Sequence, residues 1–163
     1  MIAFATAVTS VNSMLFTAVK WAVYAVAGLM IYEVIARYTL TAPTSWAPEL
    51  ATLIFGPYFL LGGPYLLHIG GHVAVDILSA RATGKLKNIL IIVGMLLAFL
   101  FGAILLWFSF PQAVQSFEYG ETTFSAWNPV IWPNKAALPL AAFLLCLQAL
   151  SEIILHLRGK GGN

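Results

Sequence analysis

Four long stretches of this chain are almost free of charged residues, and each is long enough to cross a lipid bilayer as a helix. A membrane-spanning helix needs about 20 mostly apolar residues. Segments that meet this requirement lie at residues 16–40, 49–68, 88–110 and 134–157. Within a bilayer a helix satisfies its own backbone hydrogen bonds. The sequence therefore predicts an all-α integral membrane protein with four transmembrane helices in a single membrane domain, residues 1–163.

The composition excludes several other classes of protein. Only 9% of the 163 residues are charged, whereas soluble domains have about a quarter, so lipid must face much of the surface. The one cysteine, Cys146, excludes an intrachain disulfide, a CxxC redox pair and a cysteine metal cluster. The net charge of +2 is too small to predict binding to nucleic acid.

Positive charge predicts the orientation of the spans, because Lys and Arg accumulate in cytoplasmic loops. Only Arg37 and Lys135, of the eight Lys and Arg residues, lie on the side opposite the two termini. We therefore expect cytoplasmic N- and C-termini, an inner loop at 69–87, and outer loops at 41–48 and 111–133. Residues 1–19 carry no charge, unlike a secretory signal with its basic start, and are expected to lead into the first span. The inner-loop cations are predicted to meet anionic lipid head groups; they are Arg81, Lys85 and Lys87.

Candidate site residues gather at the predicted outer end. Glu33 and Arg37 are four residues apart and so lie on one helical face within reach of an ion pair. An ionisable residue in a span is a candidate proton or cation site, but a carboxylate beside arginine stays ionised, which favours a neutralising pair. Glu49 follows Trp46 in the motif WAPEL, where a carboxylate in the first helical turn is favoured by the helix dipole. Trp46 and Glu49 are also candidates to grip a partner.

The predicted inner end holds a second group of polar residues. His68 and His72 have a spacing that can hold a metal or haem, but the glycines at 70–71 between them make a poor helix interior. The pattern therefore argues against such a site, and His72 with Asp76 is predicted to order the inner loop. Gln148 and Glu152 share a face of the last span, where polar side chains hydrogen-bond to neighbouring helices.

Ionisable residues within the spans lie toward the span ends, so the span centres are almost bare of polar groups. A path for an ion or anion through lipid needs such groups at depth. We also find no phosphate loop, no HExxH and no serine–histidine–acid set. The sequence thus predicts no enzyme activity and no cofactor for this chain. It predicts instead a membrane scaffold that holds a partner.

Several motifs together resemble the small, four-span membrane subunit of tripartite ATP-independent periplasmic (TRAP) transporters. The resemblance covers about residues 20–157, with the motifs in order. They are EVIARY at 33–38, WAPEL at 46–50, LGG at 61–63, HVAVDIL at 72–78 and YGETTFSAWNPVIWPNKAALPL at 119–140. The chain looks most like the branch described as mannitol, chloroaromatic or organic-acid transporters. It departs from the pattern at Pro48, where many members have another residue.

The resemblance implies a function and partners. Such a subunit is a scaffold in the bacterial inner membrane for a large membrane subunit, which carries the transport path and its Na⁺ ions. A periplasmic binding protein delivers an organic anion, either a carboxylate or a sulfonate, to the pair. The scaffold and interface residues would then include Glu33, Arg37, Trp46, Glu49, His72, Asp76 and Gln148.

Two other functions are compatible with the residues. One is a self-sufficient proton-coupled antiporter in which Glu33 takes up the proton. The other is a membrane cytochrome subunit, which a Soret absorption band in the purified protein would reveal.

Overall fold

The computed structural model of the protein describes residues 2–69 and 84–157. The predicted site residues His72, Asp76 and Arg81 lie outside these ranges. The described residues form helices joined by turns, with one isolated antiparallel bridge between Thr122 and Val130. The helices are α1 (Ile2–Val19), α2 (Ala22–Tyr38), α3 (Trp46–His68), α5 (Lys85–Glu118) and α6 (Trp132–Leu157).

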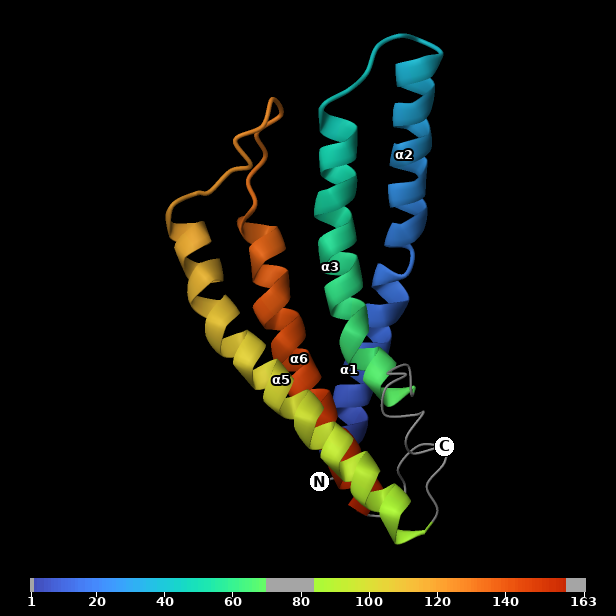
Figure 1. The fold of residues 1–163 in the computed structure, drawn as a ribbon, viewed down its shortest axis with the longest axis vertical. Coiled ribbons are helices and arrows are strands. Elements are labelled where there is room, and N and C mark those ends of the chain that lie inside the picture. The colour runs from blue at the N-terminus through green and yellow to red at the C-terminus, as the bar shows by residue number, and fades with distance from the viewer. Residues whose placement is uncertain (1, 70–83, 158–163) are drawn as a thin grey trace.

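In the described residues, four helical segments are long and apolar enough to cross a membrane, which confirms the predicted all-α fold with four spans. The first combines α1 and α2 as Ile2–Tyr38, and the others are α3, α5 and α6. The two termini of the described chain lie at the same end of the bundle (Figure 1). Which side of the membrane this end faces stays a prediction.

The first span extends further toward the N-terminus than the predicted start at residue 16. The uncharged N-terminal residues form α1, which packs against α3 and α6. A short break at Lys20 and Trp21 separates α1 from α2, and the helical hydrogen bonding resumes with Tyr24 N donating to Trp21 O at 3.1 Å. The N-terminal residues are therefore part of the bundle.

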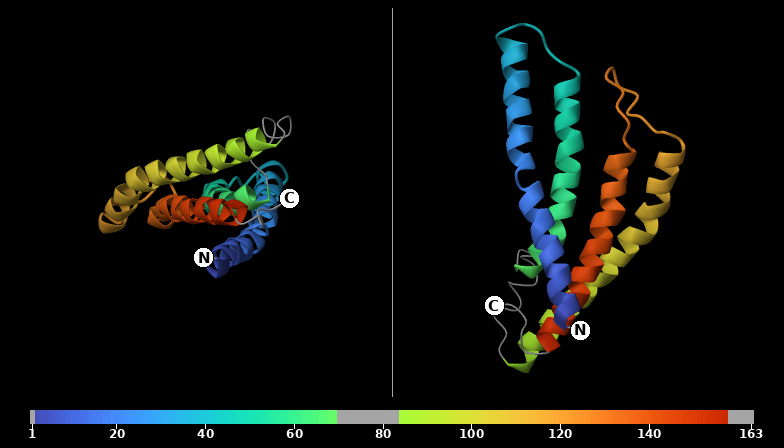
Figure 2. Two further views of the ribbon diagram at one scale, coloured as in Figure 1. Left: turned by 90° about the horizontal axis from the view of Figure 1, so that it is seen from below. Right: turned by 180° about the vertical axis from the view of Figure 1, so that it is seen from behind.

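The third span does not end before Pro111, as the sequence predicted, because α5 continues through this proline to Glu118. Proline removes one backbone donor and its ring crowds the preceding turn, yet transmembrane helices tolerate it where neighbouring helices support the backbone. Here α6 packs along α5, and α5 curves along its length (Figure 2). The outer connection is consequently shorter than the predicted loop at 111–133 and runs over residues 119–131.

Helix α6 is the centre of the bundle. It contacts α1, α3 and α5, whereas α3 and α5 do not contact each other. Of the most apolar part of α6, 56% is buried in the chain, against 0%, 17% and 6% for the other three spans in chain order. The α2/α3 hairpin and the α5/α6 hairpin diverge away from the termini (Figures 1 and 2). Most apolar side chains of α2 and α5 are thus left for lipid or for a partner.

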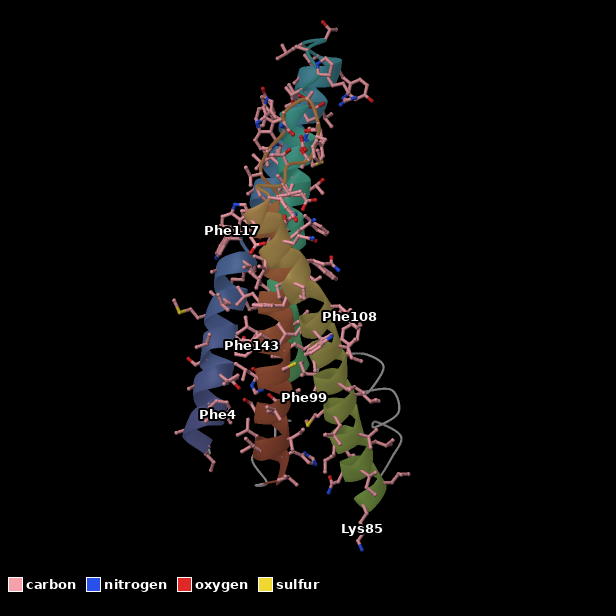
Figure 3. The ribbon with its side chains drawn as sticks, turned by 90° about the vertical axis from the view of Figure 1, so that its left-hand side faces the viewer. Phe4, Lys85, Phe99, Phe108, Phe117 and Phe143 are labelled. Atoms are coloured by element: carbon pink, nitrogen blue, oxygen red, sulfur yellow. The ribbon has the colours of Figure 1, made fainter. Side chains whose placement is uncertain are left out.

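Close packing of α5 on α6 depends on Gly102. A Cβ added at this position would lie 2.8 Å from Cys146 Sγ and 3.2 Å from Ala142 O. Small residues let membrane helices approach closely where no hydrophobic effect drives them together. The opposite side of α5 is covered with exposed apolar side chains such as Phe101 and Phe108, the second of which projects outward in Figure 3.

We call one end of the bundle the hairpin end, which comprises the turn at residues 39–45 and the hairpin at residues 119–131. We call the opposite end, where the described chain begins and ends, the termini end. The hairpin is closed by Ile131 N donating to Glu121 O at 2.9 Å and by Thr123 N donating to Pro129 O at 3.1 Å. Phe124 has a φ of 54°, which is unusual for a bulky residue. Asn128 Oδ1 holds this conformation by accepting from Phe124 N at 3.0 Å.

Candidate functional site

At the hairpin end, Glu33 links α2 to the turn before α3. Its Oε1 accepts from Arg37 Nε at 3.0 Å and from the Arg37 guanidinium at 2.5 Å. Its Oε2 accepts from the backbone N of Thr44 at 3.1 Å and from the Thr44 hydroxyl. The ion pair predicted from the spacing is present. Glu33 is 4% exposed and accepts four hydrogen bonds, so it fixes the α2–α3 connection.

Trp46 and Glu49 begin α3 at the same end. The Trp46 ring packs against Tyr32 of α2, with 5.6 Å between ring centroids. Glu49 lies in the first turn of α3, as predicted, and its Oε2 accepts from the Ser125 hydroxyl at 2.7 Å. No local sequence pattern predicts this bond, which ties the hairpin at residues 119–131 to the start of α3.

The hairpin is also attached to α6 by an ion pair. Lys135 Nζ donates to Glu121 Oε2 at 2.5 Å, and both side chains are about one-third exposed. This hydrogen bond from Lys135 lowers the pKa of the Glu121 carboxyl below its ordinary value of 4.5. Glu33, Glu49 and Glu121 are therefore all partnered within the chain.

We expect the order of the hairpin to fall at acid pH. Folding lowers the pKa of the Glu121 carboxyl. The ionised Glu121 therefore stabilises the folded hairpin fully above pH 4.5, and this stabilisation is lost as the pH falls through the lowered pKa. Amide hydrogen-exchange protection of residues 119–131, corrected for the intrinsic rate, should be constant from pH 8 to 5 and should decrease below 4.5. A Glu121→Gln variant should lose this component. An equal decrease in the variant would contradict the assignment.

At the termini end, a polar cluster joins three helices around Gln148. Gln148 is fully buried; its Oε1 accepts from Asn12 Nδ2 at 2.7 Å, and its Nε2 donates to Thr9 Oγ1 at 3.1 Å and to Glu152 Oε1 at 2.7 Å. Glu152 Oε1 also lies 2.6 Å from His68 Nδ1. The cluster, formed by Thr9, Asn12, His68, Gln148 and Glu152, therefore fastens α1 and α3 to α6.

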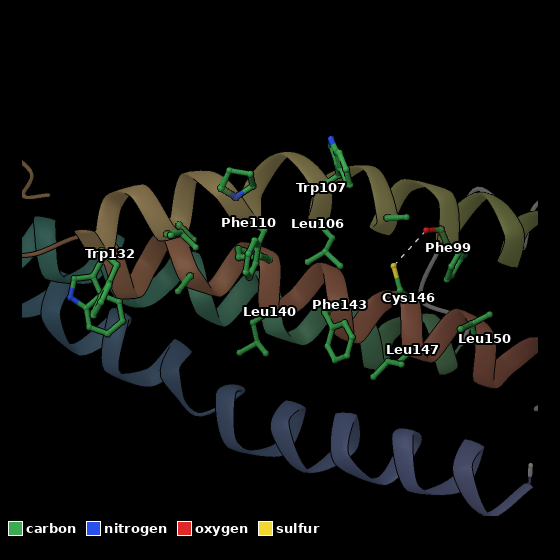
Figure 4. A pocket seen from close by; sticks show the side chains of 17 residues that line it. Phe99, Leu106, Trp107, Phe110, Trp132, Leu140, Phe143, Cys146, Leu147 and Leu150 are labelled. Atoms are coloured by element: carbon green, nitrogen blue, oxygen red, sulfur yellow. Dashed lines mark hydrogen bonds between the residues drawn. The ribbon is translucent and has the colours of Figure 1, made fainter. Parts of the chain in front are cut away.

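An apolar groove runs between α5 and α6, with a volume of about 1140 Å³. In Figure 4 the side chains of Leu106 and Phe110 point from α5 toward α6, and the dashed line joins Cys146 to the carbonyl of Phe99. All seventeen lining residues are apolar. None of these residues carries a charged side chain that could bind a carboxylate.

A comparison with known protein families identifies the class of the chain. The profile of the family described as "Tripartite ATP-independent periplasmic transporters, DctQ component" matches residues 26–159. The chain belongs to this family. No curated protein matches the sequence.

Membership in the DctQ family confirms the resemblance read from the motifs and makes the chain the small membrane subunit of a TRAP transporter. It is a transporter component of a family that is not a family of enzymes. The family also implies two partners, a large membrane subunit and a periplasmic binding protein. Assignment to the mannitol, chloroaromatic or organic-acid branch stays a prediction. Helix α1 lies N-terminal to the residues that match the family.

The structure separates the predicted site residues of this DctQ subunit into two groups. Glu33, Arg37, Trp46 and Glu49 lie together at the hairpin end, while Gln148 lies in the polar cluster at the termini end. Lys85 and Lys87 are exposed at the start of α5, and Lys85 is at its extreme end in Figure 3. Residues 2–69 and 84–157 contain no group of three or more His, Cys, Asp or Glu placed to hold a metal.

Sequence reasoning missed the partners of these residues. Asn12 and Thr9 are three residues apart and so lie on one face of α1. This polar pair in an uncharged helix is the sequence feature that indicates a polar contact with another helix. The sequence spacing groups His68 with His72, whereas in the structure His68 is hydrogen-bonded to Glu152. Ser125 and Thr44 lie in connections that have no periodicity, so nothing in the local sequence pointed to their carboxylate partners.

Proposed function

We propose that this DctQ subunit is the fixed scaffold of a sodium-coupled TRAP importer for an organic anion, either a carboxylate or a sulfonate. It works in the bacterial inner membrane with both termini in the cytoplasm. The large membrane subunit holds the Na⁺ ions and the path of the anion, and the periplasmic binding protein delivers the substrate at the hairpin end. This chain then carries no catalytic group and no cofactor.

One observation carries this proposal: Glu33 and the polar cluster around Gln148 bind helices of this chain to one another. Glu33 holds the α2–α3 turn, and the cluster around Gln148 joins α1, α3 and α6. The groove along α5 and α6 is apolar throughout. Passing an anion through lipid requires polar groups along the path. The apolar groove and the polar contacts between helices therefore favour a scaffold over a transport path.

The antiporter alternative places a proton on Glu33. Each oxygen of this carboxylate already accepts two hydrogen bonds, from Arg37 on one side and Thr44 on the other. Since a carboxylate has about four acceptor positions, protonation would break bonds that fix the turn. The geometry therefore favours a structural role for Glu33.

Transport assays in liposomes test the proposal. We expect the subunit alone to give no uptake of any organic anion under a sodium gradient, and uptake to require the large subunit and the binding protein together. Glu33→Gln, which keeps the shape but weakens the bonds to Arg37, should reduce transport only as far as it reduces assembly. Uptake by the subunit alone would refute the scaffold role. Fully assembled Glu33→Gln complexes without transport would support the antiporter instead.

A further inference from the structure

A cleft opens where α3 and α5 both pack on α6 without contacting each other. It has a volume of about 370 Å³. We call it the α3/α5 cleft. Its principal lining residues are Gly56 and Leu60 of α3, Ser109 and Gln112 of α5, and Asn134 and Lys135 of α6.

Two polar atoms in this cleft are buried and have no hydrogen-bond partner within residues 2–69 and 84–157. They are the hydroxyl oxygen of Ser109, a residue that is 6% exposed, and the amide oxygen Oδ1 of Asn134. Buried polar groups are normally satisfied, and lipid tails have no donor or acceptor to offer. The described part of the chain therefore leaves two hydrogen-bonding groups in this cleft without a partner.

The glycine at position 56 keeps the space beside Asn134 open. A Cβ there would lie only 3.1 Å from Asn134 Oδ1. Gly56 follows Trp46, the first residue of α3, by ten positions, which is about 15 Å at 1.5 Å per residue. The cleft thus lies midway along α3 and beside the first turn of α6, where Asn134 follows Trp132 by two residues.

The charge in the cleft is already balanced. Lys135 Nζ is paired with Glu121 at 2.5 Å, so the groups left over are a hydroxyl and two amides, which are neutral. The side chain that matches these groups is neutral and can both donate and accept a hydrogen bond, and a helix of a neighbouring membrane subunit can supply it.

We infer that the α3/α5 cleft is the seat for a transmembrane helix of the large partner subunit. That helix places one serine, threonine, asparagine or glutamine side chain between Ser109 and Asn134. The inference rests on the proposed function, and adds the surface and the chemistry by which the two membrane subunits recognise each other.

The test measures binding of the co-purified large subunit to this subunit in lipid nanodiscs. Asn134→Leu and Ser109→Ala remove the unpartnered atoms and should each weaken binding about fivefold to thirtyfold, as expected for loss of a buried hydrogen bond. Without the large subunit, the melting temperature of each of these two variants should be equal to that of the wild type or higher. Leu60→Trp should block the cleft, whereas Leu97→Trp, at a 60% exposed position of α5 outside the cleft, should bind like the wild type.

The outcomes separate the two proposals. If the wild-type chain does not bind the large subunit, the proposed function fails. If the wild type binds and the three cleft variants bind equally well, the cleft holds only water and this inference alone is wrong. If Leu97→Trp weakens binding as much as Leu60→Trp, the partner covers a different face of α5 and the inference is also overturned.

Discussion

Replacing Gln148 with leucine is expected to lower the free energy of unfolding of the isolated subunit by about 2–4 kcal/mol, because buried donors and acceptors lose their partners at about 1–3 kcal/mol each. Gln148 makes three hydrogen bonds, to Asn12, Thr9 and Glu152. Without Gln148, neither the nitrogen nor the oxygen of the Asn12 side-chain amide has a hydrogen-bond partner among the described residues, because Asn12 Oδ1 already lacks one. Glu152 is left with His68 alone among its observed partners.

Cys146 provides the measurement. It is the only cysteine of the chain and is buried, so a thiol-reactive fluorescent dye labels it when the bundle opens. The labelling transition in detergent should move to lower temperature in Gln148→Leu. The double variant Asn12→Leu with Gln148→Leu should recover part of the loss, because replacing both partners by apolar groups is nearly neutral.

A matched control separates the cluster from a general effect of removing an amide. Gln115 is exposed on α5, and Gln115→Leu should leave the transition unchanged. If Gln148→Leu is equally harmless, the cluster contributes no stability, and α1 would be held to α6 by apolar packing alone.

Replacing Gly102 with valine is expected to separate α5 from α6. The first added carbon already meets Cys146 Sγ at 2.8 Å and Ala142 O at 3.2 Å, and the second of these is backbone, which cannot rotate away. Overpacking of this kind costs about 1–3 kcal/mol, occasionally more. Because the α5/α6 pairing has few polar contacts, we expect the variant to be poorly folded when expressed.

A smaller change at the same position isolates the cause. Gly102→Ala should lower the melting temperature, followed by intrinsic tryptophan fluorescence, because its Cβ lies too close to Cys146 Sγ. The double variant Gly102→Ala with Cys146→Ala removes that sulfur and should recover most of the loss, since alanine also favours the helix over glycine by about 1 kcal/mol. No recovery would show that the helices are held apart by the contact with Ala142 O instead.

The sequence predicted the features that depend on local physical chemistry. Long uncharged segments are confined to spanning helices by the need to satisfy backbone hydrogen bonds in lipid, and this predicted four spans. The spacing of Glu33 and Arg37 predicted their ion pair, and the shared face of Gln148 and Glu152 predicted a packing role. The end of α5 was misplaced, because a proline that would stop a soluble helix is tolerated beside α6.

Only the tertiary structure decided which helices are neighbours and which side chains meet. Asn12 bonds to Gln148 across 136 residues, His68 to Glu152 across 84, and Ser125 to Glu49 across 76. In a soluble helix an apolar stripe marks the buried face. Here nearly every face is apolar, because lipid and protein are equally acceptable surroundings for leucine. The rotation of each helix is therefore set by a few small residues, such as Gly102, and by scattered polar groups whose partners lie far away in the chain.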